Sequence, residues 1–328
     1  MIMKHQSSRR EFLERVALLP LGAAVANVWP QSALAAGDSI PKRNPGPKLK
    51  LSLNAWSYYV QLNLHLKGQG GGMSLFDLLE ECARLDFDAV DPTGYFFPGY
   101  PEVPDRKFLH QFKRRAFDLG LSLSGTGIRN DFAAPDKAKR DADVALAKRW
   151  IESAAEMGAP VLRVFSGAHP AGHSWDEAAG WIAEALAECA EHSAKHGVII
   201  GVQNHGDMLS SAAEVLKLLG MVKSDWLGVI VDTGKFLTPD PYTDIAKVAP
   251  QAVNWQVKDL LNDRQGGHID MVKLVRIIRG SNYRGYVPIE TLPTLAEEKD
   301  KGSYDAYARV PELLNKLRKA VNASPSSS

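Results

Sequence analysis

The sequence is poor in cysteine, because Cys82 and Cys189 are the only two among its 328 residues. The disulfide framework that holds many small secreted proteins together is therefore excluded, and we expect both residues to be buried thiols within helices. The net charge is also small, because the chain has 39 lysines and arginines and 38 aspartates and glutamates. A formal net charge of +1 offers no electrostatic basis for binding nucleic acid.

Nucleotide-binding motifs are also absent. No Gly-x-Gly-x-x-Gly or Walker sequence opens the first helix, and the glycine-rich loop from Gly68 to Gly72 has no strand immediately before it. The mainly apolar stretch from Val16 to Ala26 is too short for a comfortable membrane span. A hydrophobic content of 45% is nevertheless ample for one large core.

The N-terminus carries the features of an export signal. Ser8-Arg9-Arg10-Glu11-Phe12-Leu13 resembles the twin-arginine signature, and the apolar stretch after it ends in Ala33-Leu34-Ala35, where small residues suit signal peptidase. We predict residues 1–35 to be a cleaved twin-arginine signal peptide, with a periplasmic or exported mature protein and no stable membrane span. A disordered N-terminus or an uncleaved anchor is the alternative. Cleavage removes a net charge of +2 and leaves about −1.

Extended and helical patterns alternate through the rest of the chain. We predict a linker over residues 36–48, a single folded domain over 49–322 and a disordered tail over 323–328. Short apolar runs rich in Val and Ile predict eight strands, each followed by a helical stretch with apolar residues at three- and four-residue spacing. The predicted strands are Leu49–Ser57, Ala89–Thr93, Leu121–Gly127, Val161–Ser166, Val198–Asn204, Leu227–Thr233, Val253–Lys258 and Tyr286–Thr291.

Residues at the helix ends support this division. Gly120, Gly158 and Gly197 stand where a left-handed residue ends a helix before the next strand, and Ser74 and Ser174 are suited to N-caps. Eight alternating strand and helix patterns favour a closed (β/α)8 TIM barrel over an open doubly wound sheet.

Polar side chains stand at the ends of the last four predicted strands. These ends are Gln203-Asn204-His205, Asp232-Thr233-Gly234, Gln256-Val257-Lys258 and Glu290-Thr291. Because the carboxyl ends of barrel strands meet at one rim, we expect these side chains to form one site.

The same segments resemble a known family. The runs from Ile200 to Asp207, Gly228 to Gly234, Asn254 to Asp259 and Gly285 to Glu290 are similar to those of the xylose-isomerase-like barrel family of sugar isomerases and epimerases. In that family the ends of strands five to eight usually supply Glu, Asp, His and Glu to a divalent metal. The matching positions in this chain are Gln203, Asp232, Gln256 and Glu290.

Two of the four residues depart from the family pattern. Gln203 and Gln256 each offer a neutral carbonyl oxygen in place of a carboxylate or an imidazole. Such an all-oxygen set suits magnesium, manganese or calcium better than zinc, and we expect weakly bound Mn²⁺ or Mg²⁺. The alternative is a set of buried polar residues that are hydrogen-bonded to one another with no ion.

The resemblance implies proton abstraction next to a carbonyl group, assisted by the metal. We assign Glu290 as ligand or base and His205 or Lys258 as the second proton-transfer group. Lys235 follows Asp-Thr-Gly and is suited to stabilising an oxyanion. Two structural alternatives stay open at this point: His205 as a core histidine, and Lys258 as half of an ion pair with Asp259.

Aromatic residues near the first two strands predict a carbohydrate-binding wall. Trp56 and Tyr95 are suited to packing against a sugar ring, and Asp91 to holding its hydroxyl groups. Arg163 alternates with apolar neighbours as if it points into the barrel, where it needs a protein carboxylate or a ligand oxygen.

Three functions follow from these features. The first is a metal-assisted isomerase or epimerase acting on a non-phosphorylated sugar or keto sugar, because export argues against phosphorylated metabolites. The second is a lyase or hydratase acting on 3-keto glycosides or their unsaturated products, since elimination needs one base and one leaving-group acid. The third is a non-catalytic carbohydrate-binding barrel. The sequence leaves the oligomeric state open.

Overall fold

The computed structural model describes residues 49–205, 208–299 and 304–323. All of them belong to one compact unit, Pro45–Ser328. The predicted signal peptide and linker lie outside the described residues, as do residues 324–328 of the predicted tail. Among the described residues, no helix has the length and apolar character needed to cross a membrane.

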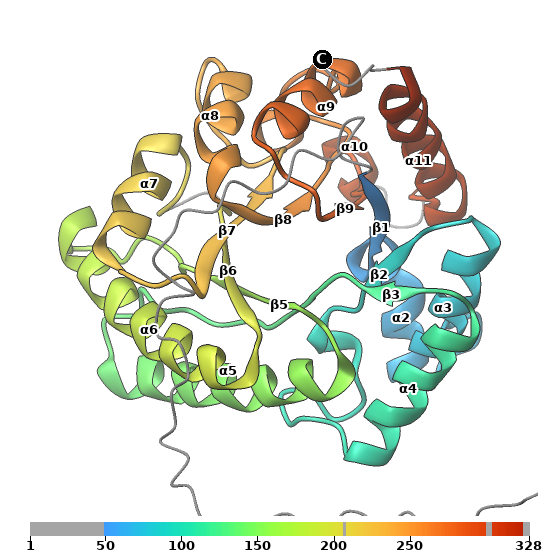
Figure 1. Ribbon diagram of the computed structural model, residues 1–328, viewed down its shortest axis with the longest axis horizontal. Coiled ribbons are helices and arrows are strands. Elements are labelled where there is room, and N and C mark those ends of the chain that lie inside the picture. Colours follow the sequence, from blue (N-terminus) through green and yellow to red (C-terminus); the bar gives the residue numbers. More distant parts are fainter. Residues whose placement is uncertain (1–48, 206–207, 300–303, 324–328) are drawn as a thin grey trace, which may run out of the picture. The chain divides into compact units, whose positions relative to one another are not determined.

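Parallel strands form a closed barrel with helices around it (Figure 1). One sheet has the order β3-β2-β1-β9 and the other β4-β5-β6-β7-β8. Isolated bridges join them into one barrel, between Thr93 and Gly127 on one side and between Val257 and Ile289 on the other. The strands are β1 (Lys50–Asn54), β2 (Ala89–Asp91), β3 (Ser122–Leu123), β4 (Thr126–Gly127), β5 (Val161–Phe165), β6 (Ile199–Gln203), β7 (Leu227–Asp232), β8 (Ala252–Gln256) and β9 (Tyr286–Ile289).

Helices connect successive strands and end at the predicted signals. Ser74 and Ser174 cap the helices that follow them, and Gly158 and Gly197 end helices in the left-handed conformation, as predicted. The helices are α2 (Tyr59–Leu66), α3 (Leu75–Arg84), α4 (Arg106–Asp118), α5 (Lys137–Met157), α6 (Trp175–His196), α7 (Ala212–Met221), α8 (Pro241–Val248), α9 (Met271–Gly280), α10 (Leu295–Lys299) and α11 (Ala306–Ala323), with short 3-10 turns η1 (Ala55–Tyr58), η2 (Gly94–Phe96), η3 (Ala249–Gln251) and η4 (Asn262–Arg264).

The predicted fold class is confirmed, and the differences are local. The first predicted strand runs three residues too far at its carboxyl end, because the Asn54 side chain accepts a hydrogen bond from Trp56 N and starts η1. The third is divided into β3 and β4. At this break Ser124 O accepts a hydrogen bond from Asn254 Nδ2 at 3.1 Å across the barrel. The last helix includes Ala323, so the predicted tail begins one residue too early.

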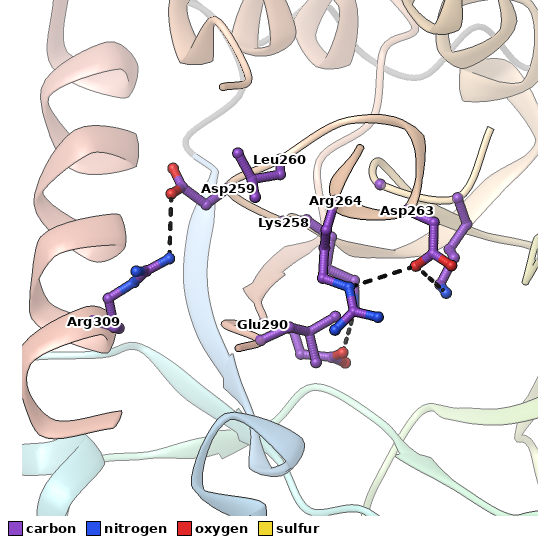
Figure 2. A pocket seen from close by; sticks show the side chains of 10 residues that line it. Lys258, Asp259, Leu260, Asp263, Arg264, Glu290 and Arg309 are labelled. Carbon is purple, nitrogen blue, oxygen red and sulfur yellow. Dashed lines mark hydrogen bonds and ion pairs between the residues drawn. The ribbon is translucent and has the colours of Figure 1, made fainter. Parts of the chain in front are cut away.

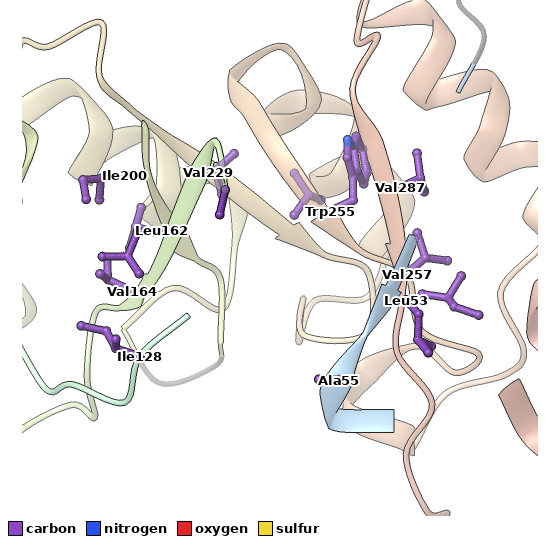
Figure 3. Close-up of a cluster of buried hydrophobic side chains, with 14 of the residues drawn as sticks. Leu53, Ala55, Ile128, Leu162, Val164, Ile200, Val229, Trp255, Val257 and Val287 are labelled. Carbon is purple, nitrogen blue, oxygen red and sulfur yellow. The ribbon is translucent and has the colours of Figure 1, made fainter. Parts of the chain in front are cut away.

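The core lies between the strands and the surrounding helices. Figure 3 shows fully buried residues of this core, among them Leu53, Trp255 and Val287 in strands and Val257 just after β8. Both cysteines are free and buried, as predicted. This packing fixes the strands against the helices, so the polar residues at the strand ends are held on one rim.

Candidate functional site

A cavity of about 320 Å³ opens at the carboxyl ends of the strands. Nine of the eleven residues that the sequence predicts for the site line this cavity, and Asp91 and Asp232 lie outside its lining. The nine are Trp56, Tyr95, Arg163, Gln203, His205, Lys235, Gln256, Lys258 and Glu290. The structure therefore brings strand ends that are far apart in the sequence into one hollow, while the roles assigned to them stay predictions.

Hydrogen bonds join three of the four predicted metal ligands, and Lys258 links the fourth, Glu290, to them. Gln203 Nε2 donates to Asp232 Oδ2 at 2.7 Å and to Gln256 Oε1 at 2.6 Å. The amide must face this way, because its NH₂ group meets a carboxylate. Asp232 Oδ1 accepts from Gly234 N at 3.0 Å. Lys258 Nζ contacts Glu290 Oε1 and lies 3.4 Å from Asp232 Oδ2.

This arrangement does not fit a divalent metal. The ammonium group of Lys258 already stands between the two carboxylates that would bind the ion, and a second cation there would be repelled. The Gln256 oxygen and one Asp232 oxygen are occupied by the Gln203 amide. The residues match the alternative that the sequence left open, a buried polar network whose members satisfy one another.

Charge interactions within this network shift the pKa values of Lys258 and Glu290. Burial lowers the pKa of Lys258, but Asp232 and Glu290 raise it by more, so its pKa is above the usual range and the amine stays protonated. Burial raises the pKa of Glu290, Lys258 lowers it and Asp232 raises it again, with a net upward shift. A carboxylate with a raised pKa is a stronger base, which suits it to accepting a proton.

His205 stands at the mouth of the cavity. Its side chain is exposed and its ring lies 4.8 Å from that of Phe165, so it is not the core histidine of the alternative interpretation. The surrounding protein and the charge of Lys235 lower the pKa of His205 to about 4. Access to solvent offsets part of this effect, and the ring is neutral at pH 7 in either case.

Asp91 lies in the barrel interior next to the cavity. It is 4% exposed, and its nearest described polar contact is Asn254 Nδ2, 3.5 Å from Oδ2. Burial raises the pKa of Asp91 to about 7, against the opposing charge of Arg163. This carboxyl group is thus partly protonated at neutral pH.

The shift of Asp91 predicts a pH-dependent stability. Its folded-state pKa of about 7 exceeds its ordinary value of 3.8, so the folded protein binds the proton more tightly than the unfolded chain. The stability that this proton provides is complete below pH 4 and is lost as the pH rises to 7. The free energy of unfolding of an Asp91→Asn variant should rise by about 3 kcal/mol relative to that of the wild type between pH 5 and pH 8, since two pH units lie between pH 5 and the folded pKa. Urea unfolding at both pH values tests this, and parallel pH profiles for the two proteins would contradict it.

Aromatic rings and two arginines form one wall. Trp56 and Tyr95 meet edge to face with centroids 5.7 Å apart. The buried Arg163 donates from Nη1 to Ile128 O at 2.7 Å and from Nη2 to the Tyr95 hydroxyl. Its protein partners are thus a carbonyl and a hydroxyl, so the predicted protein carboxylate is wrong, and the alternative of a ligand oxygen stays a prediction.

Ion pairs form the opposite wall, shown in part in Figure 2. Lys235 Nζ lies 2.6 Å from Asp263 Oδ1, and Arg264 Nη1 lies 2.5 Å from Glu298 Oε1. Asp259 pairs with Arg309, so the alternative of a Lys258–Asp259 pair is wrong.

Sequence reasoning missed Asp263, Arg264, Glu298 and Arg129, all of which line the cavity. One signal was available for the first two, because they lie in a polar loop directly after the predicted seventh strand. Asp263 and Arg264 both have positive φ, a backbone strain that is common near functional sites.

Another group of side chains has the spacing of a metal site. The ligand atoms of Glu152, His192 and His196 lie within 4.8 Å of one another, on α5 and α6. It is the only such His, Cys, Asp or Glu group in the described part of the chain, and it does not line the cavity at the strand ends. These residues can hold a metal ion, whose identity their geometry does not fix.

The chain matches the family model described as "Xylose isomerase-like TIM barrel" over residues 79–309, and it belongs to that family. Among solved structures it is similar to a 3-keto-D-glucoside 4-epimerase from E. coli, with a TM-score of 0.66 and 13% identity over 83% of this chain and 100% of that chain. It is also similar to a D-psicose 3-epimerase from Clostridium cellulolyticum H10, with a TM-score of 0.64 and 15% identity over 84% and 97% of the two chains. Comparison with curated proteins gives no match. At these identities the similarity shows the fold.

Proposed function

We propose that this protein is an isomerase or epimerase of a non-phosphorylated sugar or keto sugar, and that it works by removing a proton next to a carbonyl group. The observation that carries the proposal is the Lys258–Glu290 pair on the lining of a cavity that also has an aromatic wall. The family and the sugar epimerases of the same fold support the substrate class.

Glu290 is the base in this mechanism, and Lys258 is the cation that stabilises the product of proton removal. When Glu290 accepts the proton it becomes neutral and releases the ammonium group of Lys258. The enediolate formed at the same moment carries the negative charge that Glu290 has lost. Lys258 therefore exchanges one anionic partner for another, and little reorganisation of charge is needed. Because the residues do not fit the predicted Mn²⁺ or Mg²⁺, no step passes through a metal.

The carbon and the face to which the proton returns decide whether the reaction is an isomerisation or an epimerisation. Delivery to the neighbouring carbon gives an isomerase, and delivery from the opposite face gives an epimerase. His205 is the group that we assign to this second transfer: its N–H gives a proton to the carbon, and the ring takes one back from solvent at the cavity mouth. Lys235 is the cation that we assign to contact with a substrate oxygen.

One observation favours the second candidate, a lyase or hydratase acting on 3-keto glycosides. Gln203 cannot act as a base. Burial raises the pKa of Asp263, but its ion pair with Lys235 lowers it by more, so its pKa is below the usual range, whereas that of Glu290 is above it. Glu290 is then the one lining carboxylate assigned to proton removal, which is enough for an elimination but requires a different group for epimerisation.

Solvent exchange distinguishes these functions. The protein is incubated in D₂O with D-fructose, D-tagatose or a 3-keto-D-glucoside, and the products are analysed by NMR. Deuterium incorporation with the substituents retained supports the isomerase or epimerase, and release of water or an aglycone supports the lyase. Sugar binding without any exchange would identify a carbohydrate-binding barrel and refute both enzymes.

Export by the twin-arginine pathway also remains a proposal, which rests on the residues before Ala35. N-terminal sequencing of the protein from the periplasm should give a mature chain that begins near residue 36. A protein retained in the cytoplasm with its N-terminus intact would refute it.

A further inference from the structure

The charges of the cavity are matched on one side only. On the side of β7, β8 and β9, each lining cation contacts a carboxylate. Lys258 contacts Glu290, and the ion pairs of Lys235 and Arg264 with carboxylates span 2.6 Å and 2.5 Å. Nothing on this side requires an additional anion.

The two arginines on the other side have no such partner. No ion pair between described residues includes Arg129, just after β4, or Arg163, on β5. The guanidinium of Arg129 stands 5.0 Å from the ring centroid of Tyr95, and that of Arg163 stands 4.0 Å from the centroid of Phe165. Both arginines line the cavity.

Arg163 needs an anionic partner more than Arg129 does, because its charge is buried and only 5% of the residue is exposed. Its hydrogen bonds to Ile128 O and the Tyr95 hydroxyl use two of its five N–H donors and bring no negative charge. Aromatic faces stabilise a guanidinium, but a buried cation normally pairs with an anion. Asp91 and Glu290 influence it through space only, and the raised pKa of Asp91 leaves that carboxyl partly uncharged.

We propose that the cavity binds an acidic sugar, whose single carboxylate contacts Arg163 and Arg129 while its reacting carbon faces Glu290. The lining holds five lysines and arginines against three carboxylates, and Asp232 beneath it adds a fourth. Asp91 next to the cavity carries only part of a charge, so an excess of positive charge remains. One further negative charge balances this excess, as a sugar carboxylate supplies, whereas a phosphate brings nearly two. A guanidinium fork also binds a carboxylate through two parallel hydrogen bonds.

The barrel places the two ends of such a substrate apart. Arg163 lies on β5, which is four strand positions from β9 around the closed barrel, so it faces Glu290 from the opposite side. The Tyr95 ring lies beside both arginines and Trp56 meets it edge to face, so both rings can pack against the apolar face of the sugar. This inference rests on the proposed function for the role of Glu290, but its binding site does not depend on turnover.

Calorimetry on the whole protein tests the inference with D-glucuronate, D-galacturonate, D-glucose, D-galactose and D-glucose 6-phosphate as ligands. We expect each uronate to bind at least about 10-fold more tightly than its neutral sugar, with an advantage that shrinks as salt is added. Equal affinity for uronates and neutral sugars would overturn the proposal. Tighter binding of the phosphate than of either uronate would overturn the choice of a carboxylate.

Variants locate the contact. Arg129→Gln should weaken uronate binding about 10-fold and glucose binding by much less, while Arg149→Gln on α5 is the matched control with no effect. Arg163→Lys keeps the charge but loses the fork, and it should also weaken uronate binding. Unchanged uronate affinity in Arg129→Gln and Arg163→Lys, with both proteins folded, would place the anion elsewhere and overturn the proposal. Uronate binding without proton exchange would instead refute the proposed function and leave this inference standing.

Discussion

Replacing Glu290 with Gln should reduce the rate of deuterium incorporation into a keto sugar by at least about 100-fold, the usual contribution of a general base. The amide keeps the size of the side chain and can still accept a hydrogen bond from Lys258, but it cannot take up a proton. The cavity therefore keeps its form and loses its base. NMR of the exchanged position measures the rate, and circular dichroism confirms that the variant is folded.

A matched change on the surface separates catalysis from general effects of losing a carboxylate. Glu177 lies in the first turn of α6 and pairs with His173, outside the cavity lining. Glu177→Gln should leave the exchange rate within a factor of about two, as expected for an exposed pair. If Glu290→Gln also retained the wild-type rate, Glu290 would not be the base.

The largest change in metal binding should come from restoring the ligands of the family. Gln203→Glu and Gln256→His supply the usual donors, and Lys258→Met removes the ammonium group that stands between Asp232 and Glu290. We expect this triple variant to bind Mn²⁺ at least about 100-fold more tightly than the wild type, or about 2.7 kcal/mol. Electron paramagnetic resonance of free Mn²⁺ measures this directly, without reference to activity.

The surface group on α5 and α6 provides the control. Both proteins should carry Glu152→Ala, which removes one ligand from the Glu152, His192 and His196 group and limits binding there. Lys258→Met alone should not reach the affinity of the triple variant, because two amides remain in place of stronger ligands. Tight Mn²⁺ binding by the protein with native Lys258 would show that the ammonium group does not exclude the metal.

The sequence was enough to predict that four strand ends would lie close together, because parallel strands in a closed barrel bring their carboxyl ends to one rim. These ends carry Gln203, Asp232, Gln256 and Glu290. The position of the Lys258 amine did not follow. Lys258 is two residues past the end of β8, and a side chain with four rotatable bonds reaches many places from there. Only the packed structure shows that this amine lies between two carboxylates.

The loop regions were less predictable for a similar reason. The ion pair between Arg264 and Glu298 joins η4 to α10, two short elements that have no periodic pattern of their own. The break between β3 and β4 depends on a contact between Ser124 and Asn254, which are 130 residues apart. Local propensity carries no information on such distant contacts, whereas strand and helix periodicity does carry information on the barrel.

The bridge that closes the barrel between β8 and β9 bears directly on the Lys258–Glu290 pair. Val257 N donates to Pro288 O at 2.8 Å and Glu290 N donates to Val257 O at 2.9 Å, and these bonds hold the two half-sheets together at this point. The ammonium group belongs to Lys258, just after β8 in one sheet, and the carboxylate belongs to Glu290, just after β9 in the other. A small widening of this seam would move the Lys258 cation away from the Glu290 base, so the hydrogen bonds across the seam set the distance between the two groups.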